Sequence, residues 1–338
     1  MHAEQTGPLR FVPLHQERVW GGRRLAELFG RELAEGRPIG ESWELVDRPE
    51  AQSVVAGGPL AGVTLGELWR GRRDLFGTRA TGVRGRFPLL IKLLDARDVL
   101  SVQVHPPVAL ASLLGGEPKT ETWIVLDAAP GAYLLVGLRE GATRAQLERC
   151  LRAGGDVADL LHRVDVRGGD AILIPSGRVH AIGPGNVILE IQQNSDTTYR
   201  VFDFNRPGLD GRPRDLHVDE SLASIDFTDF TPELAPVDDD GTAISSAYFQ
   251  LDRWTLTSPR PAAAPGEMAV VCVVSGSATL GGVELGPGDL ALVPATSDPP
   301  TVGPAGGGKV AVVRAMLPGP SEPRPAEPGA PSQARRRA

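Results

Sequence analysis

The chain has 338 residues, which is enough for two domains with sizeable cores. Its hydrophobic share of 41% and charged share of 23% are ordinary for a globular protein, and its net charge of -7 argues against a nucleic-acid surface. Residues 1–10 lack the apolar core of a signal peptide, and no run approaches about 18 apolar residues, so we expect a cytoplasmic protein without a membrane partner. Cys150 and Cys272 lie far apart and indicate no disulfide framework.

The first part of the chain predicts short, mixed elements. A helical pattern of apolar residues covers residues 25–33, and strand patterns cover residues 40–46 and 52–56. Thr64 followed by Glu67 is a capping-box pattern, which predicts that a helix begins there. None of these elements is long enough to dominate the fold.

The middle of the chain predicts mostly strands. Residues 87–94 form a nearly continuous apolar run interrupted by Lys92, which is costly to bury without a partner and is therefore expected to face a polar cavity. Further strands are predicted at residues 98–105, 119–126, 133–138, 171–174, 187–193 and 198–204. Residues 143–151 and 156–162 predict two short helices. Abundant glycine (41) and proline (30) suit short strands joined by tight turns, so the chain should be mainly β with short helical inserts.

A sequence repeat indicates two β-domains. The segment Gly-Asp-Ala-Ile-Leu-Ile-Pro at residues 169–175 returns as Gly-Asp-Leu-Ala-Leu-Val-Pro at residues 288–294. The second copy has no counterpart of His180, so we expect it to pack without binding a metal. Residues 232–241 are acidic and contain proline, as in a linker. The predicted division is a catalytic metal-binding domain at 1–231, a degenerate β-domain at 242–317, and a disordered tail at 318–338.

Candidate metal ligands stand on three separate segments. Alternate side chains of a strand share a face, so Ser101, Gln103 and His105 point the same way. Glu121 lies on a second predicted strand, and His180 follows the turn after residues 169–175. Two imidazoles, one carboxylate and one amide oxygen, without a thiolate, suit zinc or another borderline divalent ion.

Several motifs together resemble a known enzyme family. The spacing Gly-x5-Pro-x-Gly-x2-His at residues 169–180 is similar to the second signature of the cupin superfamily, whose fold is a small antiparallel jelly-roll barrel. Five ordered motifs resemble the short bacterial form of type I mannose-6-phosphate isomerase; they lie at residues 39–44, 88–96, 100–106, 119–123 and 190–205. The resemblance runs from about residue 13 to residue 227. It implies a mainly β fold of two cupin-like jelly-roll barrels with short helical inserts.

The resemblance also implies a function and a set of site residues. It implies an isomerase with one Zn²⁺ per chain that interconverts mannose 6-phosphate and fructose 6-phosphate through an enediol intermediate. The implied metal ligands are Gln103, His105, Glu121 and His180. The implied catalytic residues are Arg200, Lys119 and Glu190, and the expected substrate-binding cations are Lys92, Lys119 and Arg200. One departure from the family is that Pro107 and Val108 replace acidic residues after the His-Pro pair.

Each candidate side chain also has a structural interpretation. Gln103 could serve only as a hydrogen-bonding residue, and Glu121 could pair with Lys119. Alternative ion-pair partners are Asp95 or Asp98 for Lys92, and Asp203 for Arg200. Instead of transferring a proton, Glu190 could serve only to orient Arg200 or a histidine. Trp20 and Trp43 could line the pocket or pack in the core, whereas His162 and His217 are expected to be helix-surface or structural residues.

Two other function classes fit parts of the pattern. A non-catalytic cupin sensor of sugar phosphates would keep the same pocket, and an iron cupin oxygenase would keep a similar metal site. The Gln-x-His arrangement and the set of cations argue against the oxygenase. The expected partner is a small sugar phosphate, with no nucleic acid; the oligomeric state is unknown, with a monomer favoured.

Overall fold

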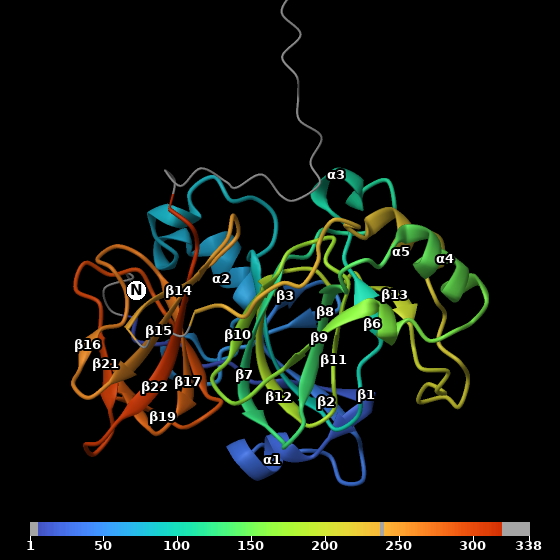
Figure 1. The fold of residues 1–338 in the computed structure, drawn as a ribbon. Helices are drawn as coiled ribbons and strands as arrows, with labels where there is room; N and C mark the ends of the chain where they lie inside the picture. Colours follow the sequence, from blue (N-terminus) through green and yellow to red (C-terminus); the bar gives the residue numbers. More distant parts are fainter. Residues whose placement is uncertain (1–5, 237–239, 320–338) are drawn as a thin grey trace, which may run out of the picture.

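Antiparallel strands in two sheets form the first barrel of the computed structural model, which describes residues 6–236 and 240–319 (Figure 1). The six-stranded sheet has the strand order β1 (Leu14–Gly22), β2 (Ile39–Leu45), β5 (Leu89–Ala96), β12 (Asn186–Gln193), β7 (Glu121–Ala128), β10 (Ala171–Ile174). The five-stranded sheet has the order β13 (Tyr199–Phe202), β6 (Val102–Val104), β11 (His180–Ile182), β8 (Tyr133–Leu138), β9 (Leu161–Asp165). Apolar side chains of both sheets, such as Trp123 and Val136, fill the space between them.

A second barrel of strands lies beside the first (Figure 1). Its five-stranded sheet has the order β14 (Asp240–Ser245), β15 (Gln250–Leu256), β22 (Val310–Met316), β17 (Ala269–Ser275), β20 (Leu290–Val293). Its four-stranded sheet has the order β16 (Arg260–Pro261), β21 (Thr301–Pro304), β18 (Ala278–Leu280), β19 (Val283–Leu285). The mainly β fold of two barrels expected from the sequence is confirmed.

A shared apolar core joins the two barrels. Leu89, Ile91 and Leu93 of β5 are buried in one cluster with second-barrel residues such as Leu292 and Val313. The other face of β5 turns toward the interior of the first barrel. Burial on both faces explains the nearly continuous apolar run of β5.

Short helices decorate the strands. They are α1 (Arg24–Phe29), α2 (Leu65–Gly71), α3 (Val108–Ala111), α4 (Arg144–Arg152) and α5 (Val218–Ser224), with a small hairpin of β3 (Asp47–Arg48) and β4 (Ala51–Gln52). The capping box predicted at Thr64 and Glu67 is confirmed at the start of α2. None of the helices in the described ranges has the length and hydropathy needed to cross a bilayer.

The helix predicted at residues 156–162 is wrong. A 3-10 turn covers Ala158–Leu160, and Leu161 then begins β9, pairing with Leu138 of β8. The apolar residues of this segment fit a short helix as well as a strand. Pairing with the exposed edge of β8 decides in favour of the strand.

The sequence repeat corresponds to equivalent strands in the two barrels. Both β10 and β20 are the last strand of their sheets, and each pairs antiparallel with the strand that precedes it in the sheet order. Asp170 and Asp289, just before these strands, each accept a hydrogen bond from the backbone N–H three residues earlier. The second barrel thus repeats the turn as well as the strand.

The predicted division into domains remains a prediction. Leu9 forms backbone hydrogen bonds of 2.8 and 2.9 Å with Leu292 of β20, so the first described residues lie against the second barrel. Residues 237–239 of the predicted linker, and the predicted disordered tail from residue 320 onward, lie outside the described residues.

Candidate active site

Three strands of the first barrel bring the candidate metal ligands together. His105 follows β6, Glu121 is the first residue of β7, and His180 is the first residue of β11. Their ligand atoms all lie within 4.8 Å of one another, and all three residues are buried. Gln103 on β6 lies opposite His180 in the sheet register. Residues that are far apart in the sequence therefore meet because β6, β7 and β11 belong to facing sheets.

Backbone carbonyls fix the orientation of both imidazoles. The Nδ1 atom of His105 lies 2.8 Å from the carbonyl oxygen of Thr197, and Nδ1 of His180 lies 2.8 Å from that of Arg178. A carbonyl can only accept, so each Nδ1 carries the proton and each Nε2 presents a lone pair. Burial lowers the pKa of His105, and it lowers the pKa of His180 to about 3. Both rings are therefore neutral at pH 7, as a metal ligand must be.

The Glu121 carboxylate lies between the two histidines. Its Oε1 atom is 3.3 Å from His180 Nε2, and its Oε2 atom is 3.4 Å from His105 Nε2. In the described part of the chain, Glu121 Oε1 and His180 Nε2 have no hydrogen-bond partner. Two buried acceptors that face each other need a cation or a proton between them. The donor set and these unpaired atoms fit a divalent ion such as zinc.

Lys119 supplies a positive charge at the same cluster. Its Nζ atom lies 2.6 Å from Glu121 Oε2 and 3.3 Å from His105 Nε2. Burial alone would raise the pKa of Glu121, but Lys119, His105 and His180 together lower it well below the usual value. Burial would likewise lower the pKa of Lys119, but the carboxylates of Glu121 and Glu190 raise it. Glu121 thus pairs with Lys119 and also faces both histidines.

Glu190 is held from two neighbouring strands. On β12 it lies opposite Lys92 of β5 and opposite Trp123 of β7. Trp123 Nε1 donates to Glu190 Oε2 at 3.0 Å, and Lys92 Nζ lies 3.5 Å from Glu190 Oε1. Burial raises the pKa of Glu190, which makes its carboxylate a stronger base than an exposed glutamate. The partners of Glu190 are therefore a tryptophan and a lysine, not Arg200 or a histidine.

Lys92 belongs to a network that the sequence did not predict. It contacts Glu41 and Asp196, each at 3.9 Å, in place of the suggested partners Asp95 and Asp98. Arg18 donates to both carboxylate oxygens of Glu41, at 3.0 Å each. Burial would raise the pKa of Glu41, but Lys92 and Arg18 lower it to about 2, so Glu41 stays charged. A lysine inside an apolar strand was the only signal of this network in the sequence.

The two tryptophans take different positions. Trp20 lines the pocket described below and also packs in the apolar cluster of the first barrel, whereas Trp43 packs in a separate small cluster and does not line the pocket. Trp43 Nε1 donates to Glu41 Oε2 at 2.6 Å, and the Lys92 Nζ atom lies 5.0 Å from its ring centroid. Trp43 thus contacts both the Glu41 carboxylate and the Lys92 ammonium group of this network.

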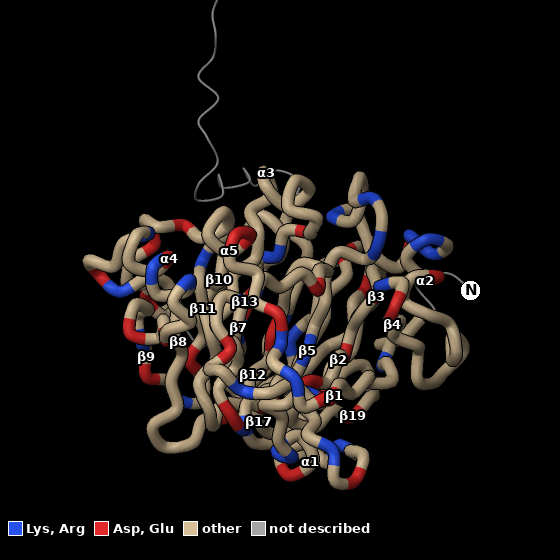
Figure 2. The backbone as a smooth tube through the Cα atoms, turned by 90° about the vertical axis from the view of Figure 1, so that its right-hand side faces the viewer, with Lys and Arg blue, Asp and Glu red and all other residues tan. Residues whose placement is uncertain are grey.

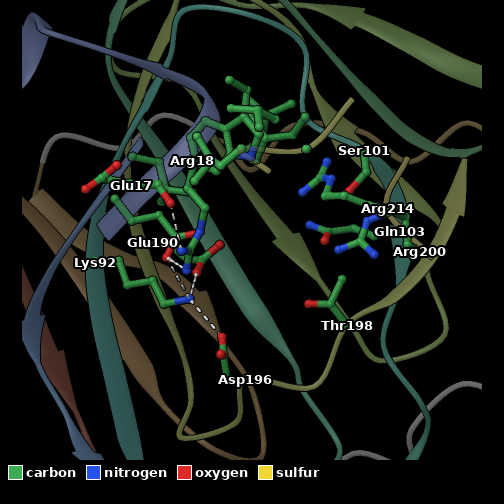
Figure 3. Close-up of a pocket in the computed structure, with 18 of the residues that line it drawn as sticks. Glu17, Arg18, Lys92, Ser101, Gln103, Glu190, Asp196, Thr198, Arg200 and Arg214 are labelled. Atoms are coloured by element: carbon green, nitrogen blue, oxygen red, sulfur yellow. Dashed lines mark hydrogen bonds and ion pairs between the residues drawn. The ribbon is translucent and has the colours of Figure 1, made fainter. Parts of the chain in front are cut away.

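A pocket of about 550 Å³ opens above these groups. Its lining includes Trp20, Ser101, Gln103, Lys119, Glu190 and Arg200. In Figure 3, Ser101, Gln103 and Arg200 lie on one side of this pocket, and Lys92 and Glu190 lie on the other. Figure 2 shows basic and acidic residues side by side in this part of the first barrel, near β5 and β12. Of the metal-ligand candidates, Gln103 lines the pocket, whereas His105, Glu121 and His180 do not.

Arg200 reaches the pocket from β13, opposite Gln103 of β6. Its Nη1 donates to the backbone oxygen of Asp215 at 2.7 Å, and its buried Nε has no hydrogen-bond partner in the described ranges. The suggested partner, Asp203, is instead bound by two other arginines. His217 accepts a hydrogen bond from the Arg200 backbone N–H at 3.1 Å, so this histidine has a structural role.

The departure from the family pattern lies outside the pocket. Pro107 precedes α3 and Val108 begins it, with 53% of Val108 exposed. Neither residue lines the pocket. The other histidine given a structural interpretation, His162, lies on β9 at the far edge of its sheet.

Comparisons with known proteins agree with this geometry. The family model for the catalytic domain of type I phosphomannose isomerase matches residues 9–130. The mannose-6-phosphate isomerase ManA of Bacillus subtilis is 39% identical over 280 residues, which cover 80% of this chain and 86% of the relative. A crystal structure of the mannose 6-phosphate isomerase from Bacillus subtilis superposes with a TM-score of 0.80 and 31% identity, over 92% of this chain and 100% of that one.

A zinc-bound mannose 6-phosphate isomerase has the same fold. It superposes with a TM-score of 0.72, over 92% of this chain and 100% of that one. Its sequence identity is 20%, so this likeness concerns the fold alone.

Proposed function

This chain belongs to the type I phosphomannose isomerases, and we propose from that premise that it interconverts mannose 6-phosphate and fructose 6-phosphate. The observation that carries the proposal is the buried cluster of His105, Glu121 and His180 beneath a pocket that also contains Glu190 and Arg200. An aldose–ketose isomerase needs a group that moves a proton between C1 and C2. It also needs positive charge near the oxygens on which charge grows.

We propose that one zinc ion is held by His105, Glu121 and His180, with Gln103 as the fourth ligand. Glu121 and His180 offer acceptor atoms without a hydrogen-bond partner among the described residues, and His105 offers an Nε2 atom that lies 3.3 Å from Lys119 Nζ. The sheet register places Gln103 beside His180. The zinc-bound relative with the same fold supports the choice of metal. When bound, zinc supplies a Lewis acid for the carbonyl and hydroxyl oxygens of an open-chain sugar.

Glu190 is proposed as the group that moves the proton. One carboxylate can take the proton from C2 and return it to C1. The isomerisation would then pass through an enediol of the sugar. Burial raises the pKa of Glu190, while the Trp123 N–H and the Lys92 ammonium keep its ionised form accessible. The carboxylate is thus both basic and fixed in direction.

The cations of the pocket have separate proposed roles. Lys119 lies near the candidate metal ligands, where its ammonium stabilises negative charge on the reacting oxygens. Arg200 lines the pocket, and its Nε has no hydrogen-bond partner among the described residues. Its proposed role is to bind substrate, because a guanidinium forms planar paired hydrogen bonds with phosphate or with sugar oxygens. Lys92 lines the pocket between three carboxylates.

A coupled assay tests the proposal. Purified protein is given mannose 6-phosphate, and fructose 6-phosphate formation is followed before chelation, after chelation, and after zinc is restored. We expect turnover that disappears on chelation and returns with zinc. Glu190→Gln should bind substrate and lose turnover. Binding of mannose 6-phosphate by the zinc-loaded wild type without any turnover would support the sensor instead.

We also propose that the reaction takes place in the cytoplasm. The cysteines Cys150 and Cys272 are both free thiols, as in proteins of a reducing compartment. Fractionation of the producing cells, followed by the same assay, should recover the activity with the cytoplasmic contents. Recovery in an extracellular or membrane fraction would contradict this placement.

A further inference from the structure

A second cavity lies beside α1, the helix that Figure 1 shows at the lower end of the first barrel. Its volume is about 1070 Å³, and none of its lining residues in the described part of the chain lines the pocket of about 550 Å³ that contains Glu190. Strands β1 and β5 contribute to both. Trp20 and Leu94 belong to the first pocket, and later residues of the same strands line the second cavity.

Four arginines line this cavity, although the whole chain has a net charge of -7. They come from the start of α1, the loop before β2 and the end of β5. Two of the four are paired with carboxylates. Arg24 forms an ion pair with Asp127, and Arg37 forms one of 3.0 Å with Glu17. The charges of these two arginines are thus compensated by the protein.

The other two arginines, Arg23 and Arg97, have no ion-pair partner within the described ranges. Arg23 donates to the backbone oxygens of Leu33, Ala34 and Arg37, at 3.2, 2.5 and 3.3 Å. These carbonyls fix its guanidinium without neutralising its charge. Arg97 is exposed, and its side chain forms no hydrogen bond with any described residue. Two guanidinium groups of the cavity therefore remain available to an anion.

A buried carboxylate supplies a free acceptor in the same cavity. Asp95 is 0% exposed, and its Oδ2 atom accepts from the backbone N–H of Arg24 at 2.7 Å. Its Oδ1 atom has no hydrogen-bond partner among the described residues. Gly22 packs so closely against this carboxylate that a Cβ atom there would lie 2.5 Å from Oδ2. A buried acceptor of this kind needs a donor, and a molecule in the cavity could supply one.

These groups define the chemistry of a ligand. The lining holds four arginines against two acidic residues, Glu27 and Asp95, so it favours an anion. Guanidinium groups form paired hydrogen bonds with carboxylate or phosphate oxygens. A bare inorganic anion would leave Asp95 Oδ1 without a donor, whereas a hydroxyl group on the same molecule would supply one.

We propose that this second cavity binds a small hydroxylated organic anion. The carboxylate or phosphate of that molecule contacts Arg97 and Arg23, and one of its hydroxyl groups donates to Asp95 Oδ1. The site is separate from the pocket of the proposed isomerase reaction, because the two cavities are lined by different residues. The proposal therefore stands or falls independently of that reaction.

Calorimetry on the zinc-loaded full chain tests the proposal. The probes are glycerol 3-phosphate and glycerate, which differ in their anionic group and so show whether phosphate or carboxylate is preferred. Mannose 6-phosphate is present throughout at a saturating concentration and occupies the first pocket. We expect one of the two probes to bind under these conditions. Failure of both to bind, or displacement of the bound probe by mannose 6-phosphate, would overturn the proposal.

Arg97→Gln tests where the anion binds. The variant should weaken binding of that probe by at least about fivefold, as for the loss of a charge-assisted hydrogen bond. Arg84→Gln is the matched control, because Arg84 is also exposed, lines neither cavity and forms no hydrogen bond or ion pair with a described residue. It should bind the probe as the wild type does. Equal affinity in Arg97→Gln and Arg84→Gln would refute the site.

Asp95→Asn tests the contact with the hydroxyl group. Each probe has a counterpart without hydroxyl groups, propyl phosphate or propionate, and the wild type should prefer the hydroxylated molecule. Asparagine can still accept from the Arg24 N–H, but it replaces the free carboxylate oxygen by a neutral amide. The preference should shrink by about fivefold, because a hydrogen bond to a charged group is the stronger one. An unchanged preference would contradict the assigned role of Asp95.

Discussion

Trp123→Phe should shift the pH dependence of the isomerase toward higher pH. The substitution removes the Trp123 N–H that lies 3.0 Å from Glu190 Oε2, while an aromatic ring still fills the core. A hydrogen bond to a charged group contributes about 1.5–3 kcal/mol, and one pKa unit corresponds to about 1.36 kcal/mol. The pKa of Glu190, already raised by burial, should therefore rise by a further ~1 to 2 units.

The sign follows from the form of Glu190 that accepts the proton. Its ionised form loses a donor, so at a given pH a smaller fraction of the enzyme has the carboxylate needed for proton abstraction. The acidic limb of kcat/KM moves to higher pH, and at pH values well above the new pKa the rate approaches the wild-type value. The assay is kcat/KM for mannose 6-phosphate, measured from acidic to alkaline pH.

Trp43→Phe provides the matched comparison. It removes a similar N–H bond of 2.6 Å to a buried carboxylate, but that carboxylate belongs to Glu41. We expect lower stability and no comparable shift of the acidic limb. An unchanged limb in Trp123→Phe, or an equal shift in both variants, would refute the reasoning that Glu190 is the titrating base.

Three further substitutions test other parts of the structure. Arg200→Ala should lose most turnover of mannose 6-phosphate while keeping the wild-type circular dichroism spectrum, and wild-type rates would remove Arg200 from the site. Leu189→Ala should destabilise the shared core by about 2–5 kcal/mol in urea titrations, because Leu189 is 2% exposed; a smaller loss would mean that the barrels pack loosely. Thr64→Ala should cost ~1 kcal/mol by removing the capping box of α2, with KM unchanged.

Local patterns predicted much of the fold. Strand β8 has the predicted bounds. Helix α4 is shifted by one residue at both ends, and β12 begins one residue earlier than predicted. These elements have strong apolar periodicity or a capping residue. The helix predicted at residues 156–162 failed because its apolar residues fit two periods, and only pairing with β8 distinguishes them.

The candidate site divides in the same way. His105, Glu121 and His180 could be named in advance because each lies in a compact motif of the chain. The network of Arg18, Glu41 and Asp196 around Lys92 could not, because it joins residues of different segments whose sheet register no motif reveals. The same holds for Arg214, which lines the pocket and donates a hydrogen bond to the carboxylate of Asp203, eleven positions earlier in the chain.

The metal content of purified protein tests the central claim most directly. The wild type and Glu121→Gln, which preserves the shape of the side chain and removes its charge, are dialysed against zinc-free buffer and analysed by elemental mass spectrometry. We expect about one zinc per chain in the wild type and far less in the variant, with isomerase activity following the zinc content. Full zinc occupancy in Glu121→Gln, or full activity in zinc-free wild type, would contradict the claim that this buried cluster holds the ion required for the reaction.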